Sequence, residues 1–176
     1  MKIQNITAYC SKTDIKPELS KVYVYTSNDI KYAVATDGYR LAELNLTSTE
    51  NKAVDFIKDG FYTVKEWQQV TSIVNKKKVD FQALESLLYG INAVQERYTG
   101  YNYPEYKKII PLESECETLK ISDIQLSRVF LIEMLELIPL DTLKMDNFKQ
   151  KKDIPSSVIV YKDNTITLLL MPHKNK

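Results

Sequence analysis

The chain has 176 residues, of which 44% are hydrophobic and 27% charged, so it can bury a sizeable core in one domain or slightly more. Its formal net charge of +1 gives no electrostatic reason to expect a nucleic acid or a membrane surface as partner. No apolar run reaches membrane-spanning length and residues 1–5 lack the apolar core of a signal peptide, so we expect a cytoplasmic protein with no membrane partner.

The first part of the chain predicts a strand followed by a β-hairpin. Residues 21–25 are rich in β-branched and aromatic side chains, which is typical of a strand. Residues 30–44 alternate around Asp37-Gly38, the strongest short turn signal, because glycine adopts a positive φ without a steric penalty. The spacing of residues in this hairpin, taken alone, predicts that Arg40 forms an ion pair on the protein surface. The return strand alternates as well: one set of side chains is Arg40, Ala42 and Leu44, and the other set is Leu41, Glu43 and Asn45.

The middle of the chain predicts a strand that starts at Gly60, then one helix and three short strands. Residues 47–59 are polar and predict a loop. Thr63 and Glu66 have the spacing of a capping box. Behind them, a helix over 63–75 has one apolar face: Val64, Trp67, Val70 and Val74. Gly90 interrupts the stretch that follows, where the predicted strands are 79–84, 86–91 and 93–99.

The last third of the chain predicts a strand, a helix and three more strands. The first strand covers 118–121, and the helix over 123–138 is capped by Ser122 and ended by Pro139. The three strands are 142–148, 156–162 and 165–171, with a tight turn at Asp163-Asn164. Residues 60–100 predict the same order as residues 117–171, so the pattern indicates an internal repeat in an α+β protein.

Three segments, in this order, resemble signatures of the bacterial sliding clamp, the ring-shaped β subunit of the replicative DNA polymerase. Residues 34–42, Val-Ala-Thr-Asp-Gly-Tyr-Arg-Leu-Ala, resemble its signature hairpin. Residues 103–111, Tyr-Pro-Glu-Tyr-Lys-Lys-Ile-Ile-Pro, resemble its linker, and residues 169–172, Leu-Leu-Met-Pro, its C-terminal end. The resemblance implies a cut-down clamp fold, with helices on one face of antiparallel sheets. Residues 1–111 then form a middle-domain-like unit, and residues 112–176 a half-unit resembling the end of the last domain.

The resemblance also implies a peptide-binding groove. In clamps, polymerases and repair proteins dock a short peptide between the middle and last domains, and the three signatures build the walls. Leu41, Ile109, Leu170 and Met171 then give an apolar pocket, and Tyr39, Arg40 and Lys108 a polar rim. Core packing is the alternative for each aliphatic residue. Carried over residue by residue, the site is Leu19, Thr36, Gly38, Tyr39, Arg40, Leu41, Pro104, Lys108, Ile109, Leu169, Leu170, Met171, Pro172 and His173.

The sequence has no pattern of an enzyme active site, a cofactor site or a metal site. It lacks a Walker loop and a dinucleotide-binding glycine fingerprint. Its two cysteines, Cys10 and Cys116, form no CxxC motif, and His173 is its one histidine. We therefore expect a protein without catalytic activity, whose partners are DNA polymerases or other proteins with clamp-binding motifs.

Duplex DNA is a weaker implication of the resemblance, because the inner helices of clamps turn basic residues towards the duplex. Glu133 and Glu136 make the second predicted helix less basic than a ring lumen should be. Two hypotheses follow: a homo-oligomeric ring closed by sheet edges such as 165–171 and 79–84, or a monomer or small oligomer that competes with a full-length clamp for its peptides. The DNA-facing candidates are Lys65, Lys76, Lys77, Lys78 and Arg128, although Lys76–Lys78 also fit a solvated helix end.

Overall fold

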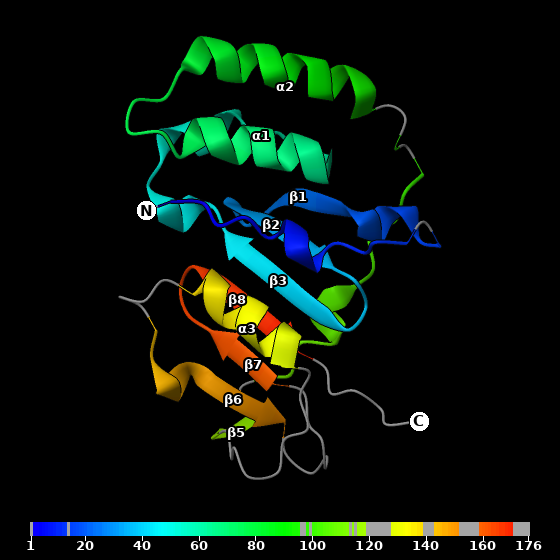
Figure 1. Cartoon of the computed structure of the whole chain (residues 1–176), viewed down its shortest axis with the longest axis vertical. Coiled ribbons are helices and arrows are strands. Elements are labelled where there is room, and N and C mark those ends of the chain that lie inside the picture. Colours follow the sequence, from blue (N-terminus) through cyan, green and yellow to red (C-terminus); the bar gives the residue numbers. More distant parts are fainter. Residues whose placement is uncertain are drawn as a thin grey trace.

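A single eight-stranded antiparallel sheet forms the centre of the computed structural model, in the order β4-β1-β2-β3-β8-β7-β6-β5 (Figure 1). The structure describes residues 2–13, 15–95, 98, 100–112, 114, 116–118, 128–138, 143–151 and 159–170. The strands are β1 (Lys21–Ser27), β2 (Ile30–Thr36), β3 (Arg40–Asn45), β4 (Gly60–Thr63), β5 (Cys116–Thr118), β6 (Phe148–Lys151), β7 (Ile159–Lys162) and β8 (Ile166–Leu170). Antiparallel pairing of β3 with β8 joins the two halves of the chain into this sheet.

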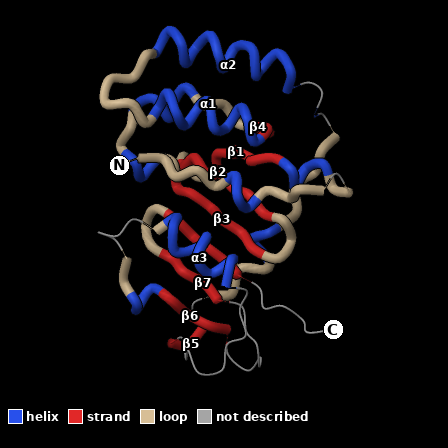
Figure 2. Tube along the Cα trace, viewed as in Figure 1, coloured by secondary structure: helices blue, strands red, loops and turns tan. Residues whose placement is uncertain are grey.

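Two helices, α1 (Val64–Val74) and α3 (Arg128–Leu137), cover the same face of the sheet, which we call the helix face (Figure 1, Figure 2). The predicted capping box at the start of α1 is confirmed: Thr63 Oγ1 accepts from the Glu66 amide at 3.3 Å, and Glu66 Oε2 accepts from the Thr63 amide at 2.7 Å. The predicted apolar stripe is confirmed as well, since Trp67 and Val70 are fully buried. Residues 119–127, with the predicted cap Ser122, and Pro139 lie outside the described residues.

A third helix, α2 (Phe81–Gln95), replaces the three strands predicted over 79–99, so that prediction is wrong. Asp80 Oδ1 accepts a hydrogen bond from the Ala83 amide at 3.0 Å, which fixes the start of the helix. Leu84, Leu88 and Ile91 follow at helical spacing and are buried in the core. Among the described residues of 60–100 the predicted repeat is therefore absent, whereas β5, α3, β6, β7 and β8 follow the predicted order.

The two predicted hairpins are confirmed. In the first, Thr36 pairs with Leu41 and Gly38 has φ +90°. In the second, Asp163 and Asn164 lie in the turn between β7 and β8. Because β8 pairs with both β3 and β7, it is a central strand, so the prediction that residues 165–171 form a sheet edge is wrong.

Two irregular stretches also differ from their predictions. Residues 47–59 contain the 3-10 turns Thr47–Thr49 and Lys52–Phe56, and Val54 and Ile57 are buried in the core, so this stretch is more than a polar loop. Strand β6 begins only at Phe148, where the predicted strand 142–148 was to end, because residues 145–147 form a 3-10 turn.

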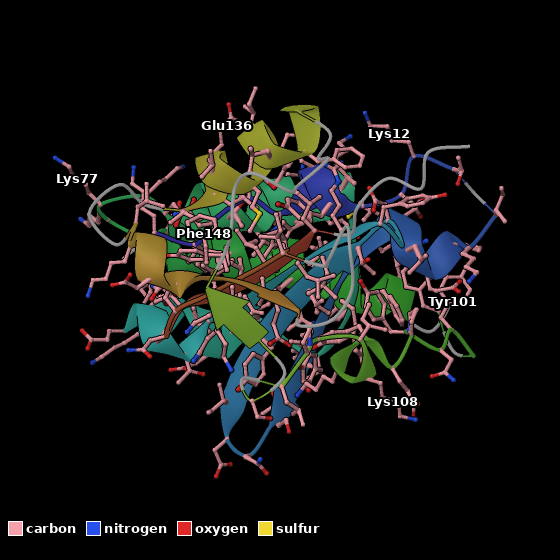
Figure 3. All side chains as sticks on the ribbon, turned by 90° about the horizontal axis from the view of Figure 1, so that it is seen from below. Lys12, Lys77, Tyr101, Lys108, Glu136 and Phe148 are labelled. Atoms are coloured by element: carbon pink, nitrogen blue, oxygen red, sulfur yellow. The ribbon has the colours of Figure 1, made fainter. Side chains whose placement is uncertain are left out.

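The opposite face of the sheet, which we call the outer face, has its own apolar cluster. Strand alternation divides the side chains of β3 between the faces, with Ala42 and Leu44 towards the helices and Leu41 outwards. In Figure 3, Glu136 of α3 lies on one side of the sheet, and Tyr101 and Lys108 lie on the other. The outer cluster consists of Leu19, Val34, Leu41, Phe61, Tyr103, Tyr106, Val160 and Leu169, and Tyr98, Tyr101 and Ile110 pack against it.

Candidate peptide-binding site

The turn between β2 and β3 is fixed by its own hydrogen bonds. Asp37 Oδ1 accepts from the amides of Tyr39 at 3.0 Å and Arg40 at 3.1 Å. The Thr36 hydroxyl donates to the Arg40 carbonyl at 2.7 Å and accepts from the Gly38 amide at 3.1 Å. These contacts hold the tip of the hairpin in one shape and leave the Tyr39 side chain 61% exposed.

Arg40 is 5% exposed and lies on the helix face, so it is not part of the predicted polar rim. Its Nε donates to Asp37 Oδ2 at 2.9 Å, its Nη2 donates to the Ala8 carbonyl at 2.6 Å, and its guanidinium pairs with Glu133 of α3. The rings of Tyr9 and Phe130 lie 5.0 and 4.3 Å from its Cζ atom. Arg40 therefore connects the hairpin to the N-terminal segment and to α3. The prediction of a surface ion pair is wrong, because the Arg40 side chain is buried.

The aliphatic members of the predicted site divide between the two faces. Leu41 and Leu169 are opposite each other across the β3–β8 junction and both are buried in the outer cluster with Leu19. Tyr103 from the linker belongs to the same cluster, and its hydroxyl lies beside the Thr36 backbone. Leu170 is buried on the helix face, so it does not join Leu41 in one pocket.

The exposed members of the predicted site come from the hairpin tip and the linker. Tyr39, Pro104, Lys108 and Ile109 are accessible, and Ile109 is 48% exposed although it is aliphatic. Lys108 pairs with Glu105 of its own 3-10 turn. The structure thus brings a buried floor to the β3–β8 junction, with Tyr39 exposed at the hairpin tip and Pro104, Lys108 and Ile109 exposed in the linker. Met171, Pro172 and His173 lie outside the described residues.

A network of tyrosines that sequence reasoning missed holds the linker on the outer face. The Tyr25 hydroxyl donates to Glu43 Oε2 at 2.8 Å, and the Tyr106 hydroxyl donates to the same oxygen. The Tyr23 ring lies 5.0 Å from the Tyr103 ring, and Lys107 Nζ lies 5.0 Å above the Tyr25 ring. Burial raises the pKa of both Tyr25 and Tyr106, so both hydroxyls remain donors. The alternation of Tyr23 and Tyr25 along β1 was the available signal.

The outer face is hollowed at the other end of the β3–β8 junction. A depression of about 450 Å³ lies there, between the end of the linker and the hairpin that joins β7 to β8. Its lining combines apolar and charged side chains, among them Lys107, Ile110, Leu112 and Lys162. A ligand seated at the hairpin tip would therefore find further open space along the linker.

The predicted DNA-facing residues come from different elements. Lys65 is exposed on α1, and Lys76–Lys78 are exposed in the connection between α1 and α2. Arg128 is the first residue of α3, and its side chain lies outside the described part of the structure. Glu133 is paired with Arg40, which leaves Glu136 as the exposed one of the two acidic residues singled out on α3.

Among the described residues, no group of three His, Cys, Asp or Glu side chains is placed to hold a metal ion. Within the same residues, no helix has both the length and the apolar character needed to cross a membrane.

No family model and no curated protein matches this chain by sequence, but solved structures match it by fold. The β subunit of DNA polymerase III from Thermotoga maritima has a TM-score of 0.57 at 12% identity, covering 98% of this chain and 62% of that one. The Borrelia burgdorferi subunit, in complex with a natural product, has a TM-score of 0.58 at 12% identity, covering 98% and 61%. The Bartonella birtlesii sliding clamp, bound to griselimycin, has a TM-score of 0.58 at 13% identity, covering 97% and 62%. As the three signature segments predict, the chain therefore has the α+β fold of the DNA polymerase III β sliding clamps, of whose length it spans about three fifths.

Proposed function

We propose that this chain is a clamp-like replication protein, without catalytic activity, that acts in the cytoplasm and binds the clamp-binding peptides of polymerases or other replication proteins. One observation carries the proposal. The β3–β8 pairing places Leu41 of the first signature opposite Leu169 of the third, and Tyr103 and Tyr106 of the second pack over them. Residues of three segments far apart in the sequence thus pack at one junction, and this supports a groove there.

The accessible side chains at this junction suit a short peptide. Tyr39 and Ile109 offer apolar contact area, and Lys108 offers a charged group for orientation. Residues 1–111 then form the middle-domain-like unit and residues 112–176 the half-unit of the last domain, with the groove between them. A small groove with few polar anchors should bind with a Kd in the micromolar range, about −8 kcal/mol.

Fluorescence anisotropy with a labelled peptide that contains glutamine and aliphatic or aromatic residues tests the proposal. We expect saturable binding, weakened about fivefold or more by Tyr39→Ser and by Ile109→Ser, because both side chains are exposed rim residues. Tyr89→Ser is the matched control, since Tyr89 is also an exposed aromatic residue but lies on α2. Absence of saturable binding at high micromolar concentration, with an unchanged circular dichroism spectrum, would refute peptide binding.

The second candidate is a monomer or small oligomer that competes with a full-length clamp for these peptides without encircling DNA. Glu136 favours it, because an exposed carboxylate on a helix of the helix face opposes the approach of phosphate. The first candidate instead requires a homo-oligomeric ring that retains duplex DNA weakly through Lys65 and its basic neighbours. Light scattering combined with retention on circular and linearised DNA at low salt separates them, because only a ring loses its DNA on linearisation.

A further inference from the structure

A second hollow lies on the outer face, over β6 and β7, next to the depression described above. Its volume is about 430 Å³. Ile110 and Pro111 of the linker line both hollows, whereas Lys149 and Val160 line only the second. Val160 also belongs to the outer cluster, together with Leu41. The second hollow therefore continues the surface on which the proposed peptide site lies.

The pairing of the strands places Lys149 in line with the floor of the proposed peptide site. Leu41 on β3 is opposite Leu169 on β8. Leu169 is also opposite Val160 on β7, and Val160 is opposite Lys149 on β6. Residues opposite each other in paired strands point to the same face of the sheet. Since neighbouring strands lie about 4.8 Å apart, Lys149 is roughly 14 Å from Leu41, which about four residues of an extended peptide can span.

A second lysine stands beside Lys149 at this hollow. Lys162 is two residues beyond Val160 on β7, so it points to the same face and is the diagonal neighbour of Lys149. Side chains at such positions are about 7–8 Å apart. Neither lysine has an ion-pair partner among the described residues. Their ammonium groups repel each other, and an anion that contacts both relieves that repulsion.

The carboxylates that line the hollow do not pair with these lysines. Asp163 Oδ1 accepts from the Thr165 amide at 2.7 Å, and its Oδ2 accepts from the Tyr161 hydroxyl at 3.1 Å. These bonds engage both oxygens within the β7–β8 hairpin. Asp146 is exposed in the turn before β6 and pairs with neither lysine. The charged groups that the hollow offers to a ligand are therefore mainly the ammonium groups of Lys149 and Lys162.

We propose that this hollow binds an acidic segment that flanks the docking motif of the same peptide. Carboxylates of the segment contact Lys149 and Lys162, and its apolar side chains contact Ile110 and Pro111. This inference rests on the proposed function and adds the chemical class of partner, a peptide with acidic residues about four positions from its apolar anchors. A single-stranded nucleic acid fits less well, because the described residues that line the hollow include no aromatic side chain on which a base could stack.

Fluorescence anisotropy with three labelled peptides tests the inference. The first is the core peptide of the binding test, with glutamines on both flanks. The other two carry glutamates about four residues from the core, one on the N-terminal flank and one on the C-terminal flank. We expect one of these two to bind about fivefold or more tightly than the glutamine peptide at low salt, and this gain to shrink at high salt. Only one flank should respond, because a bound peptide runs in a single direction.

Two double variants then locate the gain. Lys149→Gln/Lys162→Gln should remove it and leave the affinity of the glutamine peptide unchanged, because both lysines lie outside the core site. Lys77→Gln/Lys78→Gln is the matched control, since it removes the same charge from exposed residues between α1 and α2. This control should keep the gain.

The outcomes separate the inference from the proposed function. A glutamine peptide that does not bind refutes the proposed function, whereas an acidic peptide that still binds through Lys149 and Lys162 supports the hollow by itself. Equal binding of all three peptides overturns the inference alone. So does a gain that survives Lys149→Gln/Lys162→Gln or is lost in the control. An oligothymidylate of about ten nucleotides that binds the same two lysines more tightly than the acidic peptide assigns the hollow to a nucleic acid, and also overturns it.

Discussion

Replacing Arg40 by methionine tests the contact that joins the hairpin to the rest of the molecule. Methionine keeps much of the length of the side chain but removes the bond to Asp37 at 2.9 Å, the bond to Ala8 at 2.6 Å and the pair with Glu133. Removing one partner of a buried ion pair typically costs about 3–5 kcal/mol. The side chains of Asp37 and Glu133 are 17% and 30% exposed, so water can partly solvate them after the substitution. We therefore expect a loss of about 3 kcal/mol of the free energy of unfolding.

Urea unfolding followed by circular dichroism measures this loss, and the melting temperature should fall by about 6–12 °C. The double variant Arg40→Met/Glu133→Gln should lose less than the two single losses combined, because it leaves no unpaired carboxylate on α3. Lys65→Met, which removes an exposed charge from α1, is the control and should change stability by less than about 0.5 kcal/mol. A loss below about 1 kcal/mol for Arg40→Met, or strict additivity in the double variant, would refute the coupling between hairpin and α3.

Three further predictions concern the turn and the buried ionisable groups. Gly38→Val should cost about 1–2 kcal/mol through backbone strain at φ +90°, measured by thermal melts against Gly90→Ala, which should stabilise. Burial raises the pKa of the Cys10 thiol from 9.0 to about 12, so in a Cys116→Ser background a thiol reagent should react with it only after unfolding. The pKa of the Cys10 thiol is higher in the folded than in the unfolded protein. The protonated thiol therefore contributes its full share of the folding stability below pH 9.0, and this share is lost as the pH rises towards about 12. The raised pKa of Tyr106 acts in the same direction, so urea midpoints should fall steadily in alkali and recover partly in Tyr106→Phe.

Local signals were enough to predict the hairpins and the start of α1 from the sequence. Asp37-Gly38 and the Thr63–Glu66 pair act over a few residues, so their outcome depends little on the rest of the fold. The region of α2 was ambiguous, because Gly90 and short apolar runs also fit strands. Asp80 as an N-cap and the spacing of Leu84, Leu88 and Ile91 favoured the helix, and packing against α1 decides for it.

The candidate site could be predicted only in part, because its contacts join distant segments. Alternation along β3 placed Arg40 and Leu41 on opposite faces, but it could not indicate that Glu133 is the partner of Arg40. The same holds for the linker: Tyr106 is close to Glu43 only after the linker has crossed the outer face. The resemblance to clamp signatures identified the segments that meet. Only the folded structure shows on which face of the sheet each side chain lies.

Contacts on both faces of β3 hold the hairpin in one position. On the helix face, Arg40 holds the turn through Asp37 and connects it to α3. On the outer face, Leu41 packs with Leu169, and Glu43 receives the hydroxyls of Tyr25 and Tyr106. The loop that carries Tyr39 is therefore ordered before any ligand arrives. A site ordered during folding loses little conformational entropy on binding, which is why we expect micromolar affinity for the proposed groove in spite of its few polar anchors.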